Sequence, residues 1–173
     1  MHPDAGNDVE RPCRRYYISA AAPARATSFE GGGGKCGMGT RNPQGHKGYG
    51  ENCWGLTASY TVNGYTAHRP MQNDPGVITP TAALSSFPYT PDESMKALRH
   101  FYFTLGDSIW GVYGFYDAFS IGHGWYPKRY LAIDQLTIAP MIENHRTGLL
   151  WRLFMNAPEI REGLKKLGFE VAV

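Results

Sequence analysis

The strongest constraint on the fold lies between residues 90 and 106, where a helix-start signal precedes a stripe of apolar residues. Thr90 can cap the first turn, Pro91 suits the first helical position, and Glu93 completes a capping box. Apolar residues then recur with a period close to 3.6: Met95, Leu98, Phe101, Tyr102 and Leu105. We therefore predict a helix here that stops at Gly106.

The C-terminal part of the chain shows further helical patterns. One helix is expected to begin near Asp134, which would cap it, and to end or bend at Gly148; Pro140 either kinks it or lies in its first turn. Pro158 opens a last helix that Gly168 stops. A further apolar face lies between them and consists of Leu149, Leu150, Leu153 and Phe154. Since no segment shows the two-residue alternation of a sheet, the predicted fold class is mainly α, with long connecting loops.

The chain divides into two segments of different composition. Residues 1–47 are rich in glycine, with four in a row from Gly31 to Gly34, and we predict a poorly ordered N-terminal segment. The glycine run is not followed by the Lys-Ser/Thr pair of a phosphate-binding loop. Residues 48–173 are dense and patterned, and we predict that they form the domain.

Charge and composition exclude several classes of protein. The net charge of +2 over 173 residues does not fit a strongly basic nucleic-acid binder. No run of 18 apolar residues occurs, so no membrane span is expected, and the start lacks the pattern of a secretory signal. Cys13, Cys36 and Cys53 include no C-x-x-C pair, and the histidines form no H-x-x-x-H. We therefore predict no metal site and no cofactor.

Three acidic residues stand in apolar or aromatic sequence, namely Asp117, Asp134 and Glu143. A carboxylate in such a run is costly to bury unless it is paired, and burial can raise its pKa so that it serves as a general acid. The alternative is that each braces or caps a helix end, which fits Asp134 best. Glu51, just before a Trp-containing motif, is a fourth candidate.

Aromatic side chains offer a second set of candidate site residues. An indole ring covers the C–H face of a sugar well, and carboxylates beside indoles are typical of sugar-cleaving sites. The alternative is that the aromatic rings fill the core, and it fits Trp54 and Trp125 least, because both stand beside glycines in expected loops.

Several longer stretches carry a resemblance to a known family. They are Glu51-Asn-Cys-Trp-Gly-Leu-Thr-Ala-Ser59, Gly76-Val-Ile-Thr-Pro-Thr-Ala-Ala-Leu-Ser-Ser86, Trp110-Gly-Val-Tyr-Gly-Phe-Tyr-Asp-Ala-Phe119, Tyr130-Leu-Ala-Ile-Asp-Gln135, Met141-Ile-Glu-Asn144 and Thr147-Gly-Leu-Leu-Trp151. From about Tyr49 to Phe169 the chain resembles the C-terminal part of bacterial glucoamylase-like proteins, the family that includes endo-β-1,2-glucanases. The resemblance implies an (α/α)₆ toroid, incomplete here because the chain holds less than half of such a domain.

The resemblance also implies metal-free acid/base hydrolysis of a β-glucan, most plainly a β-1,2-linked one. The acids most often assigned to catalysis in the family lie mainly in the part that this chain lacks, so at most part of an acid/base pair is expected here. Within this chain, Asp117 and Glu143 are the catalytic candidates. The candidate substrate-binding residues are Trp54, Trp125, Tyr116, Asp134, Gln135, Asn144 and Arg146.

Two other functions remain open. The chain could be a non-catalytic carbohydrate-binding remnant, or an inert truncated fragment whose apolar helix faces are uncovered. The expected partner is an oligo- or polysaccharide, with no nucleic acid and no membrane span. Relatives that act on glucans are often exported, yet this sequence shows no signal, so its localisation and oligomeric state are left open.

Overall fold

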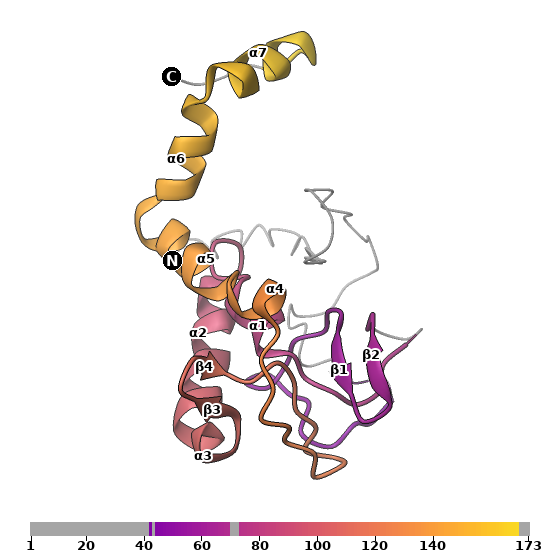
Figure 1. Ribbon diagram of the computed structural model, residues 1–173. Coiled ribbons are helices and arrows are strands. Elements are labelled where there is room, and N and C mark those ends of the chain that lie inside the picture. The colour runs from indigo at the N-terminus through magenta and orange to yellow at the C-terminus, as the bar shows by residue number, and fades with distance from the viewer. Residues whose placement is uncertain (1–41, 43, 70–72, 170–173) are drawn as a thin grey trace, which may run out of the picture.

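The computed structural model describes residues 42, 44–69 and 73–169, and this part of the chain is mainly helical (Figure 1). Most of the predicted N-terminal segment, including its glycine run, lies outside the described residues. The helices are α1 (Pro80–Leu84), α2 (Pro91–Arg99), the π-helical turn η1 (His100–Thr104), α3 (Gly106–Ile109), α4 (Ala132–Gln135), α5 (Ile138–Thr147), α6 (Leu149–Asn156) and α7 (Pro158–Lys166). Two short hairpins accompany them, β1 (Ser59–Thr61) with β2 (Gly64–Thr66), and β3 (Trp110–Gly111) with β4 (Gly114–Phe115).

The hydrophobic core lies where α1, α2 and η1 meet the segment that follows β4. Phe101 is fully buried and packs edge-to-face on Phe119, with ring centroids 5.7 Å apart. Phe119 also exchanges two main-chain hydrogen bonds with Ile78, of 2.8 and 2.9 Å. These contacts join the segment before α1 to the loop that carries Asp117.

The helix predicted from the stripe begins at Pro91, as expected, but two details of the prediction are wrong. Thr90 makes no side-chain capping bond to the helix main chain. Its hydroxyl instead bonds to the Ser86 carbonyl (3.3 Å) before the helix and to the Ser94 hydroxyl (3.2 Å) in α2. Gly106 begins α3 instead of ending the helix. The π-helical turn also shifts the phase of the stripe, so Tyr102 is exposed while Phe101 is buried.

The prediction that Asp134 caps a helix is also wrong. Asp134 lies inside the four-residue α4, and the longer α5 begins four residues later, at Ile138. Pro140 falls in the first turn of α5, where its missing N–H breaks no helical hydrogen bond. Gly148 ends α5 in a left-handed conformation (φ +66°), as predicted.

Two short hairpins accompany the helices, although no segment of the sequence shows the alternation of a sheet. In the β1–β2 hairpin, Tyr60 pairs with Tyr65 in antiparallel register. Each strand has only two or three residues, which is too short for an alternation pattern to stand out in the sequence. The Asn63-Gly64 doublet at the turn was the available signal.

The last two helices extend away from the rest of the fold, at the yellow end of the chain in Figure 1. α7 begins at Pro158 as predicted, and neither α6 nor α7 has a buried residue. Leu153 and Phe154 on the predicted apolar face of α6 are 62% and 59% exposed. No helix in the described part of the chain has the length and apolar character needed to cross a membrane.

Candidate active site

Asp117 is held in place by main-chain hydrogen bonds. It follows β4, its side chain is fully buried, and its N–H donates to the Arg129 carbonyl at 2.9 Å. The main-chain N–H of Tyr60 in β1 donates to Asp117 Oδ2, also at 2.9 Å. This hydrogen bond ties the Asp117 side chain to β1.

Asp134 in α4 is the partner of Asp117. Its side chain is 2% exposed, and burial raises its pKa to about 7, with the hydrogen bond and the charge of Asp117 adding to the effect. Two buried carboxyl groups within hydrogen-bonding reach cannot both be charged without a large free-energy cost. The pair therefore retains a proton up to near-neutral pH, which is the property that a general acid needs.

The β1–β2 hairpin places aromatic rings beside this acid pair. Tyr60 and Tyr65 meet edge-to-face with ring centroids 5.8 Å apart, and the Arg129 guanidinium lies 5.2 Å from the centre of the Tyr60 ring. Burial raises the pKa of the Tyr65 hydroxyl, and the nearby charges of Asp134 and Asp117 raise it further. No sequence motif singles out Tyr60, Tyr65 or Arg129, because only the folded chain brings the hairpin and Arg129 to the acids.

Glu143 does not meet Asp117 in the described contacts. Its carboxylate accepts a hydrogen bond from the Arg146 guanidinium (2.8 Å) and one from the Thr147 hydroxyl (2.9 Å), both on α5. The structure thus brings Asp134, not Glu143, beside Asp117. The catalytic role of Glu143 and the substrate-binding role of Arg146 stay predictions. Glu51 forms an exposed ion pair with Lys96, which lowers its pKa.

The aromatic candidates lie in different surroundings. Trp54 is buried in the hydrophobic core, which is the alternative that the sequence analysis left open. Trp125 is half-buried and exchanges two main-chain hydrogen bonds with Ser120. Tyr116 packs on Tyr130 with ring centroids 5.1 Å apart. None of the three has a described side-chain contact to the acid pair, so their substrate-binding roles stay predictions.

The two amide candidates contact main-chain groups. Gln135 accepts a hydrogen bond from the Leu131 N–H at 2.6 Å, which closes the first turn of α4. Asn144 is buried and accepts the Trp151 N–H at 3.1 Å, so it caps the start of α6.

Several of these residues carry buried polar atoms that find no hydrogen-bond partner among the described residues. They are Asp117 Oδ1, Asp134 Oδ2, Gln135 Nε2, Asn144 Nδ2 and both ring nitrogens of His68. Unpartnered buried polar atoms are rare in folded proteins and call for an explanation at each site. Four of the residues concerned are candidate site residues from the sequence, and Gln135 directly follows Asp134.

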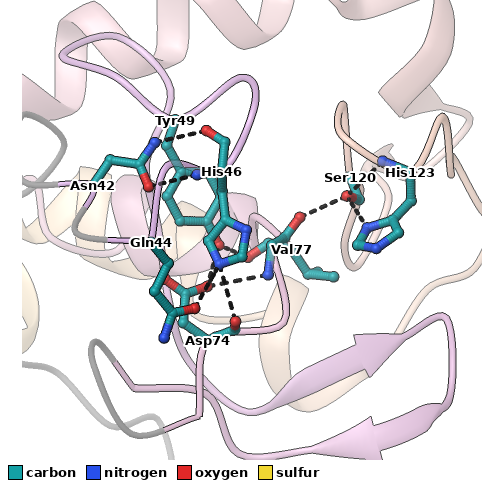
Figure 2. A network of polar contacts seen from close by, with 9 residues as sticks. Asn42, Gln44, His46, Tyr49, Asp74, Val77, Ser120 and His123 are labelled. Carbon is teal, nitrogen blue, oxygen red and sulfur yellow. Dashed lines mark hydrogen bonds and ion pairs between the residues drawn. The ribbon is translucent and has the colours of Figure 1, made fainter.

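A second polar network braces the segment that carries Asp117 (Figure 2). Asp74 accepts hydrogen bonds from the Tyr49 hydroxyl (2.6 Å) and the Gly76 N–H (3.2 Å), and His46 Nε2 lies 3.5 Å from the same oxygen. The Gly76 carbonyl accepts the Ser120 hydroxyl at 2.6 Å, three residues beyond Asp117. His46, which we placed in the Gly-rich segment, therefore takes part in the folded structure.

Fold and site together define a class: a mainly helical protein that carries a buried pair of carboxyl groups flanked by tyrosines. Residues 36–158 match the Glycoamylase family model (“Putative glucoamylase”). Because the match covers most of the sequence, the chain belongs to the Glycoamylase family. The matched region begins before residue 48, inside the predicted N-terminal segment.

Relatives with named activities are similar to part of this chain. An exo β-1,2-glucooligosaccharide sophorohydrolase of Parabacteroides distasonis is 50% identical over 127 residues, which are 73% of this chain and 18% of that protein. The solved endo-β-1,2-glucanase of Chitinophaga pinensis, in complex with sophorotriose and glucose, is 61% identical with a TM-score of 0.72, over 73% of this chain and 30% of that one. A solved β-1,2-glucanase from Parabacteroides distasonis is 50% identical with a TM-score of 0.70. The chain thus spans about a third or less of the length of these relatives.

Proposed function

We propose that this chain supplies part of the active site of a glycoside hydrolase that acts on β-glucan, with β-1,2-linked glucan as the substrate. In this proposal the described helices form one portion of an (α/α)₆ toroid. The single observation that carries the proposal is the buried Asp117–Asp134 pair, with the pKa of Asp134 raised to about 7. The relatives named for β-1,2-glucan hydrolysis support the choice of substrate.

The spacing of the pair limits what it does in the reaction. The two carboxyl groups that flank a glycosidic bond lie roughly 5–5.5 Å apart in retaining enzymes and roughly 6.5–9.5 Å apart in inverting ones. The hydrogen bond and the charge of Asp117 are among the causes that raise the pKa of Asp134, so the two acids lie side by side and not on opposite sides of a glycosidic bond. The pair therefore acts as one unit on one side of the bond, in which Asp134 holds the proton and Asp117 supports it.

In this mechanism the second catalytic carboxyl comes from outside the described residues. Asp134 gives its proton to the departing glycosidic oxygen, and the other carboxylate activates water. Tyr60 and Tyr65 offer their rings to the C–H face of a sugar unit next to the pair.

The test is incubation of the purified chain with linear β-1,2-glucan, followed by analysis of short oligosaccharide products. The Chitinophaga pinensis enzyme serves as the positive control. In that longer enzyme, replacing the residue aligned with Asp134 by asparagine is expected to lower kcat about 10²–10⁴-fold. Replacement of the residue aligned with the exposed Asp92 is the matched control, and the Glu143 equivalent tests the prediction from sequence. Full activity without the Asp134 equivalent would contradict the proposal.

Carbohydrate binding without turnover is the second candidate function. The observation that favours it is the close spacing of the pair, which leaves the chain without a described opposing carboxyl group. It predicts that β-1,2-glucooligosaccharides shift the NMR signals of Tyr60 and Tyr65 while no product forms. Product formed by the chain alone would exclude this candidate, and the absence of any shift at saturating oligosaccharide would exclude sugar binding by the isolated chain.

A further inference from the structure

Two threonine hydroxyls contact the main-chain carbonyl of Asp134, and a serine hydroxyl contacts both of them. The Thr81 hydroxyl on α1 lies 2.5 Å from this carbonyl oxygen, and the Thr137 hydroxyl, just before α5, lies 2.8 Å from it. Ser85, just after α1, lies 2.8 Å from the Thr137 hydroxyl and 3.1 Å from that of Thr81. The Thr81 and Thr137 oxygens are 2.7 Å apart. We call Thr81, Ser85 and Thr137 the hydroxyl cluster.

The hydroxyl cluster is buried and closed. Thr81 and Ser85 are 2% and 7% exposed, and Thr137 is half-buried. Each hydroxyl has one proton to donate, so at most three of these five contacts are hydrogen bonds at the same time. The carbonyl oxygen of Asp134 has two lone pairs, and both threonine hydroxyls can donate to it together while Ser85 donates to one of them.

The short helix α4 needs such anchors. A four-residue helix has no stability of its own in water, so its position depends on tertiary contacts. At its first turn the Gln135 side chain binds the Leu131 N–H. The Asp134 carbonyl near its C-terminal end is bound by the hydroxyl cluster. The opposite face of the helix is exposed at Ile133, as is Leu136 just after it.

We propose that the hydroxyl cluster positions Asp134, and that Thr81, Ser85 and Thr137 set the separation between the carboxyl groups of Asp134 and Asp117. Asp117 is bound to β1 through the Tyr60 N–H, and Asp134 is bound to α1 through the hydroxyl cluster. The two acids therefore depend on separate supports, and a change in one support alters their spacing. This inference rests on the proposed role of the acid pair.

The hydroxyl cluster carries no charge, so it acts on Asp134 through position. Asp117 acts on Asp134, and Asp134, Asp117 and Tyr60 act on Tyr65, so none of these titratable groups belongs to the cluster. A substitution in the hydroxyl cluster therefore adds or removes no charge near the pair. Any change that it causes in the titration of Asp134 reports a change in position or in access to water.

The experiment is a carboxyl ¹³C NMR titration of the 173-residue chain, with the Asp134 signal assigned through Asp134→Asn. Thr81→Val removes the hydroxyl and keeps the shape of the side chain. It is expected to lower the pKa of Asp134 from about 7 by roughly one unit or more, because the pair separates and water enters. Thr81→Ser keeps the hydroxyl and is expected to keep the pKa of the parent.

Ser94→Ala is the matched control. It removes another fully buried hydroxyl, which donates to a main-chain carbonyl of α1 (Ala83) at 2.8 Å and makes no described hydrogen bond to the hydroxyl cluster. A folded Thr81→Val chain with an unchanged pKa of Asp134 would overturn the proposal. An equal shift in Ser94→Ala would also overturn it, because general loosening would then explain both.

If Thr81→Val does not fold, Ser85→Ala decides the matter. This variant leaves both threonine hydroxyls on the Asp134 carbonyl and removes their third partner, so a smaller shift in the same direction is expected. An unchanged pKa in folded Ser85→Ala would count against the proposal. The titration uses no substrate, so its result is independent of the glucan assay. The hydroxyl cluster can position Asp134 even if the chain takes no part in glucan hydrolysis, and hydrolysis can occur even if the cluster does not position Asp134.

Discussion

At the scale of single residues, the site depends on two acidic side chains, Asp117 and Asp134, that are buried next to each other. Asp117 Oδ2 accepts the main-chain N–H of Tyr60, while Asp117 Oδ1 and Asp134 Oδ2 find no donor among the described residues. Burial raises the pKa of Asp134, and the neighbouring carboxyl adds to that effect. In the proposed mechanism, Asp134 is the member of the pair that carries the proton.

This shift predicts a pH-dependent stability. In the unfolded chain Asp134 loses its proton near pH ~4, but in the folded chain it loses it near pH 7. Between these values the folded state binds more protons, so the contribution of Asp134 to the free energy of unfolding is full at low pH and is lost as the pH rises to about 7. Urea unfolding between pH 4 and 8 should show this loss in the parent and not in Asp134→Asn.

His68 changes the pH dependence of stability in the opposite direction to Asp134. The parent must therefore be compared with Asp134→Asn. Burial lowers the pKa of His68 to about 4, so its contribution falls as the pH drops from its ordinary value toward 4. The difference between parent and Asp134→Asn removes this effect, because both chains contain His68. Exposed Asp92→Asn is the control and should follow the parent. Parallel curves for the parent and Asp134→Asn would show that the assigned pKa is wrong.

At the scale of secondary structure, close main-chain contacts between loops and helices hold the site together. Gly55 precedes β1, and its carbonyl accepts the Thr79 N–H at 2.9 Å at the start of α1. It has a φ of +141°, and a Cβ there would lie 2.5 Å from the Thr79 carbonyl oxygen. The loop can therefore approach α1 only because residue 55 has no side chain.

The contact predicts different outcomes for two glycine substitutions. Gly64→Ala, at φ +114° with open space around it, is expected to cost about 1–3 kcal/mol from backbone strain alone. Gly55→Ala is expected to cost a further ~1–3 kcal/mol, because the main chain of Thr79 must also move. Equilibrium unfolding in urea measures both. Equal losses at the two positions would mean that the close contact to α1 does not matter.

At the scale of the whole molecule, the chain ends in helices with uncovered apolar faces. α6 has no buried residue, and Leu149, Leu150, Trp151, Leu153 and Phe154 are all exposed. Water-exposed apolar patches of this kind favour association. The relatives are several times longer than the matched region, which fits a face that packs against more protein.

The exposed face predicts association of the isolated chain. We expect the chain to bind an apolar dye and to sediment as larger species at higher concentration. Leu153→Lys with Phe154→Lys should lower dye fluorescence several-fold, since it removes the two most exposed side chains of that face. Arg152→Glu changes charge on the same helix without removing apolar area and is the control. A strictly monomeric parent that binds no dye would contradict this expectation.

The sequence predicted the acids better than it predicted their pairing. Asp117 and Asp134 were both identified because each stands in apolar sequence, and both are buried. Glu143 is a catalytic candidate on the same grounds, yet it lies on a half-exposed face of α5 and binds Arg146. Asp117, Asp134 and Glu143 all stand in apolar sequence. Which two of them come together depends on the conformation of the loop between β4 and α4, and no local sequence pattern predicts that conformation.

The sequence by itself determined the helical class and several helix ends. Pro91 and Pro158 start helices and Gly148 ends one, because the dihedral preferences of proline and glycine act on their own residue and its neighbours. Only the tertiary structure decided where the π-helical turn falls, that the β1–β2 hairpin stands beside the acids, and that Asp134 meets Asp117. These features rest on contacts between residues far apart in the chain, where burial and hydrogen bonding outweigh local preference.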